Sequence, residues 1–339
     1  MNYAVNKIEV IDEVVVSKEE KNEFKIPKGT YFILAAKLAE RFSFFLIDSL
    51  LIFYIGDLLT QENFADPESK AQKYYHSFYV LSNALVLPAA LLSDGLTGAY
   101  KAWIAMAMMN ILGLILLFFS SFPVLNSSAS VGQWPLFLMG YAIYAIGVGG
   151  TKILQIIGGD QFKLPKDNDA MSTFFSNLYV FANVGSVAAY FVFPVLKDRP
   201  LQLQDSEAKF ALILIVSSAS FFVATLLMIF GRPHFKIEKP SSPNAFDFFR
   251  CMAFGLRDKL KTVLHSIHCQ SSSKRELNLS PKKRKTTHWI DVAEEKLGSH
   301  FVSDVKVVLH IWTLFATYPV FWTLFYQMVM TDFLTASES

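Results

Sequence analysis

Charged side chains interrupt an otherwise apolar stretch near the start of the chain: Lys37, Glu40, Arg41 and Asp48. On a helix that turns about 100° per residue, Lys37, Arg41 and Asp48 share one stripe, and Glu40 lies beside it. The two positive and two negative groups can pair, with Arg41 reaching Asp48 through a neighbour or a water. An unpaired charge at the bilayer centre costs at least about 2.5 kcal/mol, so a neutral cluster that faces a cavity is the cheaper arrangement. Such a cluster indicates an ion or substrate path; the alternative is that it only locks helices together.

Further polar and aromatic positions could serve the same path. Histidine is the side chain that most readily changes charge near neutral pH, so His76 could carry protons, or it could be a hydrogen-bonded packing residue. Lys152, in "GVGGTKILQII", could bind an anionic group or pair with a carboxylate. Tyr179 and Asn183 are spaced to share a helix face, where ordinary interhelical hydrogen bonding is the alternative. Trp322 lies near the middle of an apolar stretch, away from the interfacial belt that Trp usually occupies.

The elements that must position these residues are long apolar helices. Of the 339 residues, 53% are hydrophobic and 18% are charged, whereas average soluble domains carry about 25% charge. Apolar blocks predict membrane spans at 31–56, 74–93, 102–122, 133–157, 172–196, 209–230 and 307–330. Each approaches the ~20 residues that a helix needs to cross the hydrocarbon core. The sequence therefore predicts an all-α membrane protein with seven spans.

The lysines and arginines predict how these spans are oriented. If the N-terminus is cytoplasmic, most Lys and Arg residues fall on the cytoplasmic side, in 1–30, 94–101, 158–171 and 231–306. Cytoplasmic loops carry such an excess, so we expect the N-terminus inside. We also expect a multi-pass integral membrane protein, with the plasma membrane as its location. Both cysteines then lie in a cytoplasmic segment and are expected to be reduced.

The predicted organisation has five parts. They are a cytoplasmic tail (1–30), a six-helix half (31–230), a cytoplasmic linker (231–306), a seventh span (307–330) and a C-terminal tail (331–339). Between the first and second spans, 57–73 is expected to be a polar external loop. Within the linker, one stretch alternates apolar and basic positions in a way that suits an amphipathic helix on the membrane surface. The basic run after it suits anionic-lipid contact, but an ordinary positive-inside loop is the favoured interpretation.

Several motifs occur in order between about residue 31 and residue 327. They are "ERFSFF", "ALLSDGLTGAYK", "GGTK" followed by "GGDQF", "FFSNLYVFANVGS", and "HWIDVAEEKLGSHFVSDVK" with the following "FW". Together they resemble the signature regions of the proton-dependent oligopeptide transporters. These belong to the major facilitator superfamily, which is built from two six-helix halves. The resemblance implies the N-terminal six-helix half plus one helix of the second half.

The resemblance also implies functional roles. Such transporters move di- and tripeptides inward with protons by alternating access between two halves. Proton coupling is implied for His76, Glu40, Arg41, Lys37 and Asp48. Peptide binding is implied for Tyr54, Lys152, Tyr179, Asn183 and Trp322, with Lys152 contacting a carboxylate. Protons would be the coupling ion, and we expect no other cofactor and no metal.

The chain departs from the family pattern at two of these positions. Lys37 stands where the pattern has its first glutamate, and Asp48 stands where animal members often carry arginine. This exchange keeps the stripe neutral and is expected to be compensatory. After Gln327 the match ends, so we expect a truncated family member whose transport activity on its own is doubtful.

Other classes of function remain as alternatives. The main one is a non-transporting peptide sensor or a regulatory partner of a full-length transporter. A seven-helix receptor is disfavoured because its N-terminus would lie outside. An enzyme is disfavoured because the sequence offers no nucleophile–base set, metal-ligand spacing or phosphate loop. The expected partners are small peptides and membrane lipids, with self-association or pairing with a full-length relative as a further possibility, and no nucleic acid.

Overall fold

The chain divides into two units by its contacts. The computed structural model describes residues 26–122, 133–197, 199, 201–203, 206–208, 210–237, 245–271, 288–315, 321 and 324. The units are Met1–Ser241 and Ser242–Ser339. The predicted division after residue 230 falls slightly earlier, because the last helix of the first unit continues past that point.

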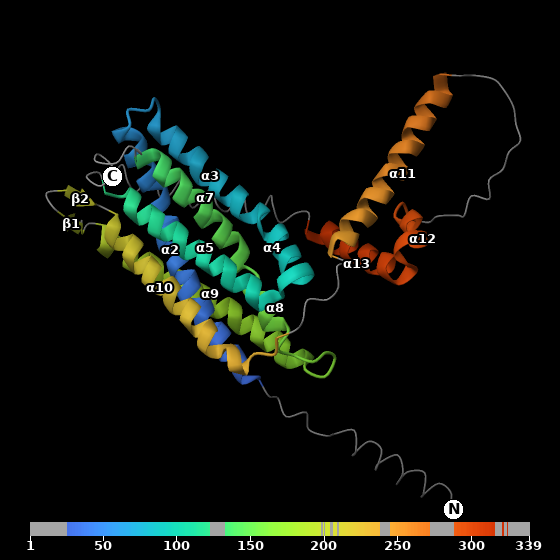
Figure 1. The fold of residues 1–339 in the computed structure, drawn as a ribbon, viewed down its shortest axis with the longest axis horizontal. Helices are drawn as coiled ribbons and strands as arrows, with labels where there is room; N and C mark the ends of the chain where they lie inside the picture. Colours follow the sequence, from blue (N-terminus) through green and yellow to red (C-terminus); the bar gives the residue numbers. More distant parts are fainter. Residues whose placement is uncertain are drawn as a thin grey trace, which may run out of the picture. The chain divides into compact units, whose positions relative to one another are not determined.

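In the described part of the first unit, six helical segments are long and apolar enough to cross a membrane. They run side by side (Figure 1). In chain order they are α2 (Lys28–Gln61), α3 (Pro67–Ala84) with α4 (Val86–Leu92) and a π-helical turn (Ser93–Thr97), α5 (Ala99–Ser120), α7 (Gln133–Thr151) with α8 (Leu154–Gly159), α9 (Asn168–Lys197), and α10 (Ala211–Gly231) with a 3-10 turn (Arg232–His234). These correspond to the first six predicted spans. The predicted all-α membrane architecture is confirmed for this unit, apart from one short strand pair, β1 (Leu201–Leu203) and β2 (Ser206–Ala208).

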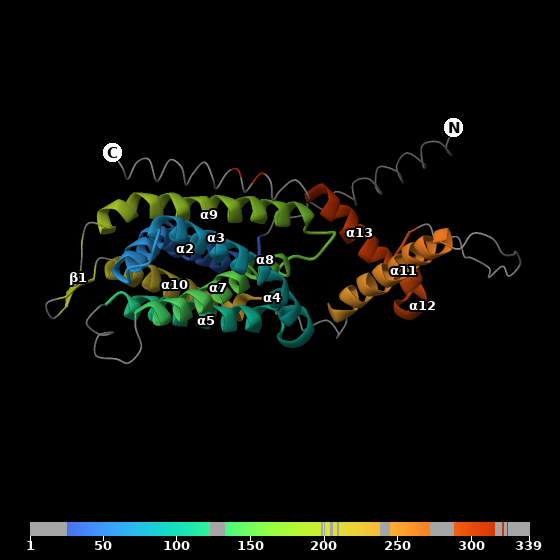
Figure 2. The same cartoon turned by 90° about the horizontal axis from the view of Figure 1, so that it is seen from above.

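Helix α2 lies at the centre of this unit. It packs against α3 on one side and against α9 and α10 on others, while α5 packs mainly against α7. Figure 2 shows α9 and α5 on opposite sides with α2 between them. Because α2 is covered on several sides, its charged residues are placed inside the helix bundle.

Two glycines let α5 and α7 approach each other closely. A Cβ added at Gly113 would stand 2.5 Å from the backbone nitrogen of Tyr144, and one added at Gly147 would stand 2.4 Å from that of Asn110. Real Cβ atoms do not come so near, so these helices touch backbone to backbone. Small residues at helix interfaces allow this in membranes, where close packing rather than the hydrophobic effect drives helix association.

The predicted external loop at 57–73 is wrong in its extent. Helix α2 continues to Gln61 and α3 already begins at Pro67. Proline is favoured at the first helical position because its missing N–H would have no partner there. The polar residues on either side therefore extend the two helices instead of forming a loop.

The second unit is a small helical assembly. It contains α11 (Ala245–Ser271), a 3-10 turn (Asp291–Ala293), α12 (Glu294–Leu297) and α13 (Ser299–Phe315). Its buried core consists of Cys251, Ile290, Ala293, Val302 and Val305. Cys251 is a free thiol, and its burial raises the pKa of that thiol. The predicted seventh span begins within α13, and most of that span lies outside the described residues.

Candidate functional site

The carboxylate of Glu40 holds two cations inside the helix bundle. Lys37 Nζ lies 2.9 Å from Glu40 Oε2. Arg41 donates from Nε to the same oxygen over 2.9 Å, and from a terminal nitrogen to Oε1. Lys37 is 4% exposed and Glu40 is 2% exposed. In this cluster of Lys37, Glu40 and Arg41, the predicted pairing of Lys37 with Glu40 is confirmed, and Arg41 shares the same carboxylate. Buried charges are costly unless they are paired.

Arg41 is further held by an aromatic ring. Its guanidinium carbon lies 4.8 Å above the ring centroid of Phe44, one turn along α2. Such a cation–π contact adds stabilisation where the cation is shielded from water. The face of α2 that carries the cluster is therefore fixed in geometry.

Asp48 is bound by two tyrosines of α3. Tyr75 donates its hydroxyl to Asp48 Oδ1 over 2.9 Å, and Tyr79 donates to the same oxygen. Arg41 also interacts electrostatically with Asp48. The sequence analysis did not identify Tyr75 and Tyr79, although their spacing of four residues places both hydroxyls on one face of α3.

Lys152 connects α7 to α3. Its ammonium donates to Asn83 Oδ1 over 2.5 Å. The same ammonium interacts electrostatically with Arg41, Glu40 and Lys37. The charges of the α2 cluster therefore act on Lys152, whereas the direct hydrogen-bond partner of Lys152 is a neutral amide.

His76 lies on the exposed side of α3, seven residues before Asn83. Two turns of a helix bring such residues to the same face. Its imidazole packs edge-on against the ring of Tyr75, with centroids 5.8 Å apart. The predicted proton carrier therefore lies next to one of the tyrosines that bind Asp48.

Tyr179 and Asn183 lie on an exposed side of α9. Tyr179 is 73% exposed, and the Asn183 amide donates to the Tyr179 carbonyl within the same helix. The opposite, buried side of α9 meets α2 at Gly185, where an added Cβ would stand 2.5 Å from the carbonyl oxygen of Leu38. The sequence analysis missed Gly185, although a small residue among larger apolar ones is the usual signal of close helix contact.

Tyr54 lies elsewhere, inside the bundle. It is 4% exposed, its hydroxyl shares a 2.6 Å hydrogen bond with Ser120, and its ring packs on Phe137 and Phe210. The structure therefore does not bring Tyr54 together with the exposed residues on α3 and α9. Trp322, the remaining predicted peptide contact, lies outside the described residues.

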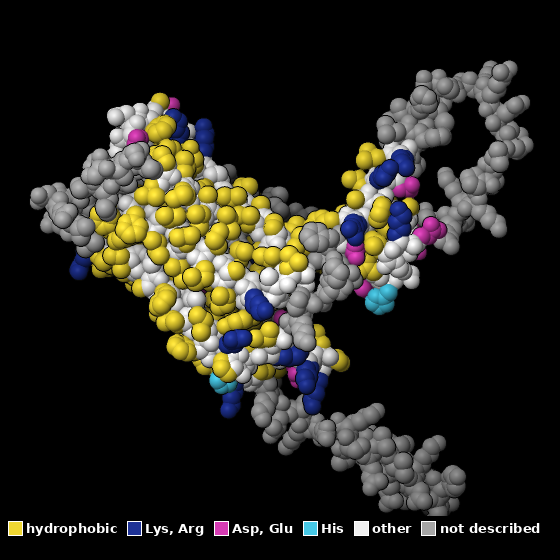
Figure 3. Space-filling view, in the orientation of Figure 1, with side chains coloured by type: hydrophobic (Ala, Val, Ile, Leu, Met, Phe, Trp, Pro, Cys, Tyr) yellow, Lys and Arg dark blue, Asp and Glu magenta, His cyan; other side chains and the backbone are white. Residues whose placement is uncertain are grey.

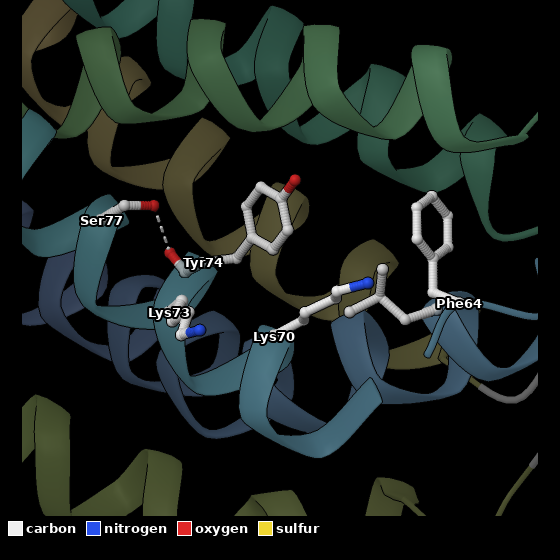
Figure 4. Close-up of a pocket in the computed structure, with 6 residues that line it drawn as sticks. Phe64, Lys70, Lys73, Tyr74 and Ser77 are labelled. Carbon is white, nitrogen blue, oxygen red and sulfur yellow. Dashed lines mark hydrogen bonds between the residues drawn. The ribbon is translucent and has the colours of Figure 1, made fainter. Parts of the chain in front are cut away.

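A pocket of about 410 Å³ opens beside the end of α2 and the start of α3. Phe64, Lys70 and Tyr74 line it, and Figure 4 shows Lys70 reaching toward Phe64. The Lys70 ammonium lies 5.0 Å from the Phe64 ring centroid. The pocket contains none of the predicted site residues, so the candidate site is the charged face of α2 with α3 and α7.

Within the described ranges, no group of three or more His, Cys, Asp or Glu side chains could hold a metal ion.

Comparisons with known proteins give a consistent result. The sequence model of the POT family matches residues 100–337. Human solute carrier family 15 member 1 is 26% identical over 312 residues, which are 90% of this chain and 41% of the relative. Drosophila melanogaster peptide transporter family 1 is 26% identical over 302 residues, 89% of this chain and 37% of the relative.

A solved structure shares the fold. The in meso crystal structure of the POT family transporter PepTSo superposes with a TM-score of 0.65 at 20% identity, covering 92% of this chain and 63% of that one. At this identity, the likeness supports the fold alone. The chain spans about two fifths of the length of the curated relatives it matches.

Proposed function

Because the chain belongs to the POT family, we propose that it supplies the N-terminal half of a proton-coupled pathway for di- and tripeptides. One relative, which matches along 89% of this chain, is named peptide transporter family 1. Alternating access needs two halves around a central site. In this proposal, the six-helix unit provides one wall of that site.

The observation that carries the proposal is the pairing pattern around Lys152. The cations Lys37 and Arg41 share the carboxylate of Glu40, whereas Lys152 is bound to the neutral amide of Asn83. An arriving carboxylate can replace an amide as the partner of an ammonium, because it adds the attraction between opposite charges that a neutral amide lacks. Lys152 would accordingly bind the carboxylate of the peptide.

The exposed residues extend this site. Tyr179 and Asn183 on α9 are proposed to contact the peptide, and Trp322 is proposed to contact it from the second half. The buried position of Tyr54 favours a packing role over peptide contact. Membrane lipids would cover the remaining apolar surface of the six-helix unit.

Proton coupling is assigned to groups that can gain or lose a proton beside the peptide. His76 is proposed as the entry point because it is exposed on the same face of α3 as Asn83. Asp48 and Glu40, with the cations Lys37 and Arg41, would respond to the proton through their shared charges. Protons are the proposed coupling ion.

Uptake of a labelled dipeptide into proteoliposomes by this chain tests the proposal. Uptake should be greater at about pH 5.5 than at about pH 7.5, because histidines ordinarily change charge between these two values. It should fall strongly in Lys152→Gln, while Lys101→Gln, on an exposed position of α5, serves as the matched control. Equal uptake by Lys152→Gln and the parent would overturn the assigned role of Lys152.

A second candidate is a peptide sensor or a partner of a full-length transporter. Saturable dipeptide binding without uptake, from protein that reaches the membrane, would favour this candidate. We further propose a plasma-membrane location with a cytoplasmic N-terminus, and self-association or pairing with a full-length relative as the route to a complete pathway.

A further inference from the structure

Helix α11 of the second unit has one face that is occupied by its own unit. Cys251 is fully buried there, and Phe248 and Met252 pack against the same core. At Gly255, an added Cβ would stand 2.5 Å from the ring of Trp289. These contacts fix which side of α11 faces inward.

The opposite side of α11 carries an apolar stripe. Phe249, Leu256 and Leu260 are 39%, 55% and 52% exposed. At about 100° per residue these three side chains fall within roughly 40° of one another, and the stripe lies about 160° from Cys251. No core of the second unit covers this stripe within the described residues.

Basic side chains flank the apolar stripe on both sides. Arg250, Arg257 and Lys261 lie along one edge, and Lys259 lies along the other. Figure 3 shows blue side chains beside yellow ones over this helix. Asp258, in contrast, falls on the side away from the stripe. An apolar stripe with basic edges is the pattern of a helix that lies in the surface of a membrane rather than in water.

The length of the connecting chain limits how far the start of α11 can lie from the sixth candidate span. The sixth candidate span ends at His234, and the described chain continues to Ile237. From there to Ala245, eight residue steps can reach at most about 28 Å. The start of α11 is therefore tethered within a short distance of a membrane-crossing helix, so the lipid surface is the partner that is always present at high concentration.

We infer that α11 lies in the bilayer interface and binds anionic phospholipids. Phe249, Leu256 and Leu260 enter the boundary between headgroups and acyl chains. Arg257, Lys259 and Lys261 lie at the level of the phosphates and serine carboxylates of the lipid headgroups. Anionic lipids attract basic residues near the surface, so the affinity depends on their presence. This inference is independent of whether the chain transports peptides.

A fluorescent probe on the stripe tests the inference in the full chain. An environment-sensitive fluorophore is attached at Leu256→Cys in protein that carries Cys269→Ser, with the buried Cys251 left in place. The same protein without Leu256→Cys gives the background labelling. In nanodiscs that contain phosphatidylserine, the probe should shift to shorter wavelength and should be quenched by lipids that carry a quencher in their acyl chains.

The matched control is the same probe at Asp258→Cys, two residues away on the other side of the helix. It should be quenched much less than the probe at Leu256→Cys. Phosphatidylserine should increase the quenching of the probe at Leu256→Cys. Adding Arg257→Gln and Lys261→Gln should reduce this increase by about tenfold or more.

Three outcomes would overturn the inference. Equal quenching at both positions would show that α11 does not present the stripe to lipid. A wavelength shift without quenching would mean that protein, not lipid, covers the stripe. Quenching that is the same with and without phosphatidylserine would remove the role of anionic lipid.

Discussion

The ammonium of Lys152 on α7 donates a hydrogen bond to the side-chain oxygen of Asn83 on α3, 69 residues earlier, over 2.5 Å. This contact joins two helices through one charged and one neutral group. The carboxylate of Glu40, in contrast, is shared by Lys37 and Arg41. The direct partner of Lys152 is thus an uncharged amide, whereas Lys37 and Arg41 share one carboxylate.

Replacing Lys152 should weaken dipeptide binding more than it weakens the fold. A hydrogen bond to a charged group contributes about 1.5–3 kcal/mol, so Lys152→Gln should raise the dipeptide Kd by about tenfold to a hundredfold. Binding of a labelled dipeptide to purified protein measures this. Asn83→Ala should leave the Kd within a few-fold, because it removes only the neutral partner. A larger effect for Asn83→Ala than for Lys152→Gln would contradict the assigned roles.

Glu40→Gln should destabilise the six-helix unit strongly. Removal of one partner from a buried ion pair costs about 3–5 kcal/mol, because the remaining charge stays buried without a counter-charge. Thermal unfolding in detergent should show a lower Tm than for Glu68→Gln, an exposed position on α3. Adding Lys37→Gln to Glu40→Gln should recover part of the loss, since it removes one of the two uncompensated cations. A double variant less stable than Glu40→Gln would contradict this account.

Tyr79→Phe should act through Asp48. The lost hydrogen bond to a carboxylate should lower the free energy of unfolding by about 1.5–3 kcal/mol. The same substitution in an Asp48→Asn background should cost only about 0.5–1.5 kcal/mol, because a neutral amide is a weaker acceptor. Denaturant unfolding of the four proteins gives the coupling between the residues. Tyr31→Phe, at a position 59% exposed, is the control and should be neutral.

Alanine substitutions at Gly56 on α2 and at Gly185 on α9, which packs against α2, should change the Tm differently. At Gly185 an added Cβ meets the carbonyl oxygen of Leu38 at 2.5 Å, so Gly185→Ala must push α9 away from α2. At Gly56 the nearest atom is the Cβ of Ala71 at 3.9 Å, which is an ordinary contact. Alanine favours a helix over glycine by about 1 kcal/mol. Thermal unfolding should therefore show a lower Tm for Gly185→Ala and an unchanged or higher Tm for Gly56→Ala; the reverse order would contradict the observed packing.

The second unit should depend on pH through Asp291 and Lys306. Lys306 Nζ lies 2.6 Å from Asp291 Oδ1, and this hydrogen bond lowers the pKa of Asp291 and raises that of Lys306. The Asp291 contribution to stability is therefore complete above its ordinary pKa of about 3.9 and is lost as pH falls toward its lower folded-state pKa. The Lys306 contribution is complete below its ordinary pKa of about 10.4 and is lost as pH rises through its higher folded-state pKa.

Hydrogen exchange of residues 288–306, corrected for intrinsic pH effects, measures this dependence. Exchange should accelerate on acidification in the parent protein, whereas Asp291→Asn should exchange faster at neutral pH and change less on acidification. The exposed pair of His300 and Asp304 offers a control, because exposed ion pairs contribute little. An effect of Asp304→Asn as large as that of Asp291→Asn would contradict the prediction.

Much of the architecture follows from the sequence because membrane spans depend on local composition. About 20 consecutive apolar residues must form a helix in lipid, since the backbone has no water to bond with. The first six spans and the stripe that includes Lys37 and Arg41 were predictable on this basis. The ends of α2 and α3 were not, because a helix continues past the bilayer as long as its backbone bonds are made.

The partners of each charge depended on the tertiary structure. Periodicity placed Asp48 on the stripe of α2, but it could not show that Tyr75 and Tyr79 of α3 would bind it. Nor could it separate Tyr54, which is buried against Ser120, from Tyr179, which is exposed. The sequence determined which residues share a helix face, because that is set by a local repeat. Which faces meet depends on how closely backbones far apart in the chain can approach, as at Gly185, and only the packed helices decide that.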